Sequence, residues 1–78
     1  MRKLIYDDDG VAVFKIGSKY YIRYDAGTHQ IVIREDEISE DEAKQVMAGT
    51  AKATQVLFAV QRRLTAMGVD PFVSNVYN

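Results

Sequence analysis

The pattern of apolar and polar residues changes character near the middle of the chain. The first half carries short runs rich in β-branched and aromatic residues, separated by turn residues such as Asp9-Gly10. Such short connections favour antiparallel neighbours, so residues 1–34 are predicted to form a β-meander of three or four strands, the first being the weakest. The candidate strands are 3–6, 11–16, 20–24 and 31–34.

The second half follows a helical period, and a helix is predicted over residues 39–68. Ser39 and Glu42 have the spacing of a capping box, and Gly68 stands where a left-handed C-terminal cap would lie. Residues 69–78 are expected to pack as an irregular arm or to add an edge strand. The sequence therefore predicts one α+β domain over residues 1–78, with a sheet followed by one long amphipathic helix.

The length of this helix raises the question of whether it breaks at Gly49. Unbroken, it would measure about 42 Å, against about 17–20 Å for a strand of five or six residues. Either Gly49 ends one helix and a second begins at Thr50, or the helix continues and its surplus face meets another chain. An apolar seam crosses Gly49 without slipping, which favours continuity and a homodimer. The residues assigned to a dimer seam are Val46, Ala53, Leu57, Val60 and Leu64.

The same stripe would also serve as the ordinary core face of a helix on a sheet, and the two interpretations are compatible. The predicted core takes its apolar residues from both halves of the chain. Strict alternation along a strand decides which face each residue occupies, so a slip of one position would turn some of them outward. The predicted core residues are Leu4, Val13, Ile22, Ile33, Val46, Leu57, Val60 and Leu64.

Composition bounds the chemistry that the chain can support. The 78 residues carry a net charge of −1, contain no cysteine and include one histidine, His29. These counts argue against a disulfide framework, a zinc site of usual composition and a cysteine nucleophile. The glycines stand singly, so there is no phosphate-binding loop. We therefore expect no enzyme activity, cofactor or metal, no membrane span or targeting segment, and a cytoplasmic location.

Acidic residues fill six of the eight positions from 35 to 42. One interpretation is a solvated junction that also supplies favourable charge at a helix N-terminus. The other is an acidic patch that orients a basic partner surface, since charge complementarity steers association. The residues of this patch are Glu35, Asp36, Glu37, Glu40, Asp41 and Glu42.

The favoured function is a small non-enzymatic protein–protein interaction module that acts by occupying a partner surface. In format it resembles inhibitors or adaptors of phages and mobile elements, such as anti-CRISPR proteins, and its partner would be a protein, including one within a nucleic-acid-binding complex. The alternative is direct nucleic-acid binding, because aromatic residues on a sheet can stack on bases while arginines hold phosphates. The residues assigned to that alternative are Tyr21, Arg23, Arg62 and Arg63.

Overall fold

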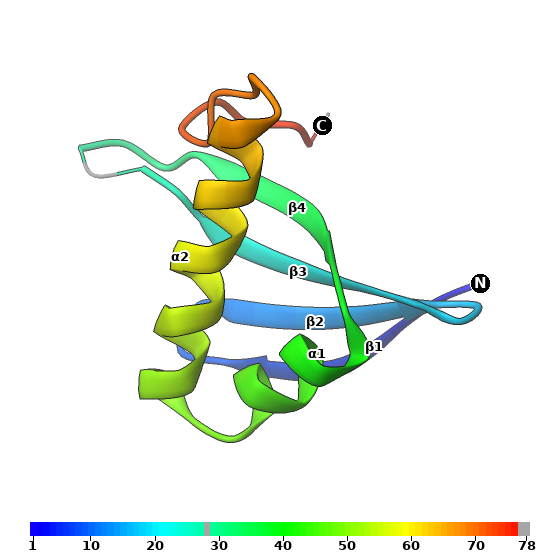
Figure 1. The fold of residues 1–78 in the computed structure, drawn as a ribbon. Helices are drawn as coiled ribbons and strands as arrows, with labels where there is room; N and C mark the ends of the chain where they lie inside the picture. Colours follow the sequence, from blue (N-terminus) through cyan, green and yellow to red (C-terminus); the bar gives the residue numbers. More distant parts are fainter. Residues whose placement is uncertain (28, 77–78) are drawn as a thin grey trace.

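Four strands form one antiparallel sheet in the order β1-β2-β3-β4 (Figure 1). This computed structural model describes residues 1–27 and 29–76. Thr28 of the predicted loop and residues 77–78 of the predicted arm lie outside the described residues. The predicted α+β meander is confirmed, including its weakest strand. The strands are β1 (Arg2–Asp8), β2 (Val11–Ile16), β3 (Lys19–Asp25) and β4 (Ile33–Ile38).

The turn between β1 and β2 follows directly from the local sequence. Asp9 and Gly10 both have positive φ, 53° and 77°, as a two-residue hairpin turn of type I′ requires. The register shifts by one residue between Leu4 and Tyr6, which places a β-bulge at Ile5. Because of this bulge, the alternation of faces changes phase within β1.

The last strand lies further along the chain than expected. It runs from Ile33 to Ile38, whereas the predicted strand covered 31–34 and the predicted meander ended at residue 34. Its middle residues are charged, and apolar alternation cannot identify such a strand. Those charged side chains form ion pairs with other strands, for example Glu35 with Arg23 on β3.

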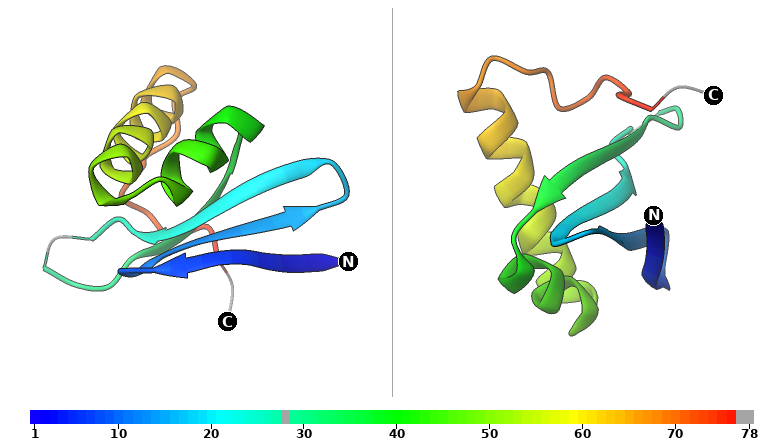
Figure 2. Two further views of the ribbon diagram at one scale, coloured as in Figure 1. Left: turned by 90° about the horizontal axis from the view of Figure 1, so that it is seen from below. Right: turned by 90° about the vertical axis from the view of Figure 1, so that its right-hand side faces the viewer.

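Two helices, α1 (Glu40–Met47) and α2 (Thr50–Ala66), replace the single helix that seam spacing favoured. The helix is interrupted at Gly49, where φ is 144°. Of the two alternatives, two helices are therefore the one observed. The capping box of Ser39 and Glu42 is confirmed at the start of α1. Both helices cover the same face of the sheet (Figure 2).

The core lies between the helices and the sheet, and it contains most of the predicted residues. Leu4 is an exception at 51% exposed, because it pairs with Phe14 on the face that the helices leave uncovered. Ile33 is half-buried but lies on that same uncovered face, so its assignment to the core was also wrong. Leu57 is half-buried and packs against the core. The other predicted core residues, Val13, Ile22, Val46, Val60 and Leu64, are buried.

The predicted dimer seam occupies this same core. Val46, Ala53, Val60 and Leu64 are buried within the chain, and Leu57 packs against the core. The seam is thus the face with which the two helices pack on the sheet, and not an additional apolar face exposed to a second chain. Neither helix, within the residues that the structure describes, is long and apolar enough to span a membrane.

The positive φ of Gly49 makes the helix break testable. Gly49→Ala should lower the free energy of unfolding by about 1–3 kcal/mol, since a Cβ is disfavoured at this backbone conformation. Apart from Gly49 and its two chain neighbours, no atom lies within 4 Å of the added Cβ, so the loss would report backbone strain. Urea unfolding measures it, with Ala48→Gly as the neighbouring control, which should lose about 1 kcal/mol or less. Equal midpoints for Gly49→Ala and the native chain would contradict this reading of the break.

Candidate functional site

The only buried charged side chain in the described part of the chain is Arg34 of β4, at 4% exposed. Its Nε donates to Asp36 Oδ2 at 3.1 Å and its Nη2 donates to Asp36 Oδ1 at 2.9 Å. Tyr24 lies opposite Arg34 on β3, and its hydroxyl donates to the same Asp36 Oδ2 at 2.8 Å. Paired in this way with the partly buried Asp36, the Arg34 guanidinium avoids the desolvation penalty of an isolated buried ion.

The third nitrogen of the guanidinium, Nη1, faces the C-terminal arm, residues 69–76. Arg34 Nη1 donates to the carbonyl oxygen of Val73 and, at 3.4 Å, to that of Asp70. A planar guanidinium can hold a carboxylate and two carbonyls at once, and the point charge of a lysine cannot reproduce this arrangement. Arg34 therefore ties together β3, β4 and the arm.

Side chains of the arm also occupy the outer edge of β4. The amide of Asn75 accepts from the backbone N–H of Glu35 at 2.8 Å and donates to the Glu35 carbonyl at 2.6 Å. Ser74 Oγ donates to the carbonyl of Ile33 at 2.6 Å. Of the two forms expected for the arm, the irregular one is observed over residues 69–76 (Figure 1). Ser74 and Asn75 nevertheless pair three backbone groups at the edge of β4: the carbonyl of Ile33 and the N–H and carbonyl of Glu35.

A groove lies between α2 and the anchored arm. Its volume is about 540 Å³, and phenylalanines flank it: Phe58 of α2 is 56% exposed and Phe72 of the arm is 57% exposed. Arg62 is the only charged residue that lines it, and no ion pair within the described residues engages Arg62. We call this feature the α2–arm groove; its remaining lining residues are Gln61, Thr65, Ala66 and Pro71.

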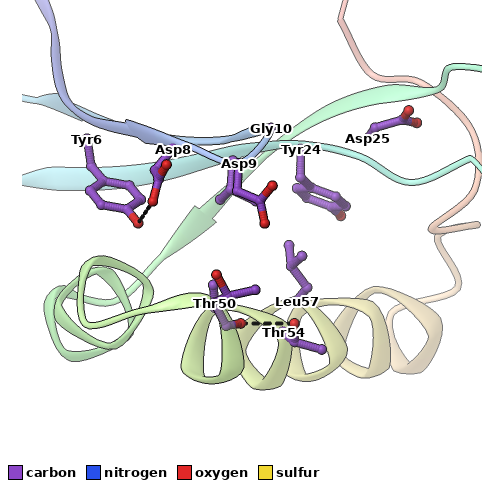
Figure 3. A pocket seen from close by; sticks show the side chains of 11 residues that line it. Tyr6, Asp8, Asp9, Gly10, Tyr24, Asp25, Thr50, Thr54 and Leu57 are labelled. Carbon is purple, nitrogen blue, oxygen red and sulfur yellow. Dashed lines mark hydrogen bonds between the residues drawn. The ribbon is translucent and has the colours of Figure 1, made fainter.

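A second hollow, of about 290 Å³, lies between the β1–β2 turn and the first turns of α2 (Figure 3). Asp8, Asp9 and Asp25 line it, together with Tyr6. Partial burial and the neighbouring Asp8 raise the pKa of Tyr6. Asp25 is committed to its own loop: Oδ1 accepts from the backbone N–H groups of Val32 and Gly27, which lower its pKa. The hollow is acidic, but Asp25 is already used structurally.

The predicted acidic patch is divided among different faces of the molecule. Glu35 pairs with Arg2 and Arg23 on the uncovered face of the sheet. Asp36 points the other way, into the network of Arg34. Glu37 lies 4.0 Å from Lys19 Nζ, and Glu40 accepts from the Tyr20 hydroxyl at 3.2 Å. The structure therefore does not gather the six carboxylates into one surface, and their role toward a partner stays a prediction.

The remaining two acidic residues, Asp41 and Glu42, lie in the first turn of α1. Burial opposes ionisation of Glu42, but hydrogen bonds from the Ser39 backbone and from Arg63 hold its pKa below the usual value. Arg63 Nη1 lies 3.1 Å from Glu42 Oε2 and so joins α2 to α1. This carboxylate is a structural contact between the helices.

The four residues assigned to nucleic-acid binding are likewise separated. Tyr21 and Arg23 lie on β3, and Arg62 and Arg63 lie on α2. Arg23 and Arg63 are both engaged in ion pairs within the chain. The sequence reasoning did not assign Phe58 or Phe72 to a site, although both were visible as apolar residues outside the main seam. Nothing in the sequence indicated that Arg34 would be buried.

The guanidinium of Arg34 should be irreplaceable by lysine. Arg34→Lys keeps the charge but loses several hydrogen bonds, so the free energy of unfolding should fall by about 2 kcal/mol or more. Denaturant unfolding checks this, with the exposed Arg62→Lys as the matched control, which should change stability by less than about 0.5 kcal/mol. Equal losses from the two variants would contradict the structural role of Arg34.

Alkaline pH should weaken the same network through Tyr24. Burial and the hydrogen bond to Asp36 raise the pKa of Tyr24 from 10.0 to about 12. A group whose pKa is raised by folding stabilises fully below its unfolded value and loses that contribution as pH rises through the folded one. The free energy of unfolding should therefore decline between pH 10 and about 12. Tyr24→Phe should flatten that decline; an equally steep decline in the variant would refute the assignment.

Comparison of the chain with protein-family models, with curated proteins and with solved structures found no match.

Proposed function

We propose that this chain is a non-enzymatic protein-binding module whose α2–arm groove receives an apolar segment of the partner bearing a carboxylate. One observation carries the proposal: Phe58 and Phe72, both more than half exposed, flank one groove. Aromatic and arginine side chains that meet in a pocket are typical anchors of protein interfaces. Burying a phenylalanine side chain stabilises by about 1.5–3 kcal/mol, and the folded monomer forgoes much of that here.

The charge of the groove specifies the partner further. Arg62 lines the groove and no carboxylate does. A partner segment that places an acidic residue against Arg62 would therefore gain orientation as well as contact area. The lining consists mainly of apolar surface with one charged side chain. Such a lining is suited to binding a partner and not to transferring protons.

The anchoring of the arm supports this assignment. Residues held in place before binding lose less conformational entropy when a partner docks. Arg34 and Asn75 fix the arm on which Phe72 stands. An inhibitor or adaptor acting in the cytoplasm, of the kind carried by phages or mobile elements, is the concrete form that we propose.

Variants of the groove test the proposal by affinity capture from a lysate of the source cells. Phe58→Gln, Phe72→Ser and Arg62→Glu should each lose a protein that the native chain retains, because each removes an anchor. Ile16→Thr changes an exposed apolar residue on the far face of the sheet and is the matched control, which should retain that protein. Thermal unfolding of each variant checks that the fold is intact.

Nuclease treatment separates the protein partner from nucleic acid. Retention that survives nuclease and is lost in the groove variants supports the proposal. Retention of the same protein by native chain and groove variants alike would remove the groove from the interface. Loss of all retained material on nuclease treatment would favour direct or bridged nucleic-acid binding instead, and would point to Tyr21 and Arg23.

A further inference from the structure

The two edge strands of the sheet, β1 and β4, differ in whether another segment of the chain covers them. The arm occupies the outer edge of β4 through Ser74 and Asn75. At the opposite edge, β1 pairs only with β2 in the described part of the chain (Figure 1). An edge strand with unpaired backbone groups can accept a further strand. The free edge of β1 is therefore a surface on which another strand can add.

The order of charges along β1 indicates which strand that is. Its first residues, Arg2 and Lys3, are basic, and its last residues, Asp7 and Asp8, are acidic. Two copies of β1 placed antiparallel about a two-fold axis bring the basic end of each against the acidic end of the other. A strand with this charge order complements itself, since opposite charges across a strand pair are stabilising.

The charges on one face of β1 also match. Arg2 lies over the Phe14 ring at 3.8 Å, and Asp7 and Phe14 line a common hollow on the uncovered face of the sheet. Asp8 lines the hollow beneath α2 on the other face, and Lys3 alternates with Arg2 onto that same face. A two-fold axis perpendicular to the sheet keeps both faces in place, so Lys3 would approach Asp8 of the second copy. Arg2 is directed the other way, across the sheet to Glu35.

The side chains of Lys3 and Asp8 are available for such contacts. No ion pair within the described residues engages Lys3, Asp7 or Asp8, and Arg2 contacts Glu35 while remaining substantially exposed. We propose that β1 pairs antiparallel with β1 of a second copy, so that one sheet continues across a symmetric homodimer.

Charged residues and a bulge on an edge strand are also the means by which monomeric proteins keep an edge from pairing. Protection of that kind works best when the charges of two approaching copies repel each other. Along β1 they attract in the antiparallel arrangement. The interface is short, so self-association should be weak and should strengthen at low ionic strength.

Sedimentation equilibrium from low micromolar to millimolar concentration measures this self-association. The mass should rise toward that of a dimer, and amide resonances that shift with concentration should lie in β1. Lys3→Asp should weaken the dimer about tenfold by setting like charges together. The double variant Lys3→Asp with Asp8→Lys exchanges the charges and should restore it. Lys52→Glu, on the exposed side of α2, is the control and should leave it unchanged.

A monomeric mass throughout the range would overturn the proposal. So would a dimer whose shifted resonances lie along the α2–arm groove, or one that Lys3→Asp does not weaken. Because the groove variants leave β1 unaltered, failure of this proposal and failure of the proposed function can be told apart.

Discussion

The buried guanidinium of Arg34 is the contact on which the rest of this small structure depends. Removing a charge from water is unfavourable unless its partners replace the solvent completely. Here the Asp36 carboxylate takes two of its donors and the carbonyls of the arm take a third. Tyr24 completes the network from β3. One side chain thus connects segments that lie far apart in the sequence through hydrogen bonds. The loss of any of its partners would leave a buried polar group without a hydrogen bond.

Several features follow from this contact. Pairing Arg34 opposite Tyr24 sets the register of β4, which turns Glu35 outward to meet Arg2 and Arg23. Holding the arm against β4 covers one edge of the sheet and leaves β1 as the open edge. It also places Phe72 beside α2, which completes the α2–arm groove. The surface that we propose for a protein partner therefore depends on a polar interaction in the interior.

Local signals in the sequence identified the elements whose cause is local. The spacing of Ser39 and Glu42 found the start of α1, and Asp9-Gly10 found the first hairpin. The fourth strand was misplaced because its inward positions are Arg34 and Asp36, which alternation assigns to solvent. The break at Gly49 remained open because seam spacing is the same for one helix and for two packed on one sheet. The sequence indicated that the arm could lie at an edge of the sheet. The side-chain contacts that hold it on β4, and the exposure of Phe72, could not be predicted, because both depend on residues that are distant in sequence.

Amide hydrogen exchange gives the sharpest view of whether Arg34 holds the arm in place. The N–H of Glu35 donates to the Asn75 side chain, so its exchange rate reports contact between β4 and the arm. In an Arg34→Lys chain that remains folded, the Glu35 amide should exchange much faster than in the native chain, while the amide of Ile22 in the central strand β3 should remain protected. Equal protection of the Glu35 amide in the two chains would show that the arm is held without Arg34, and would contradict the central role given to this residue.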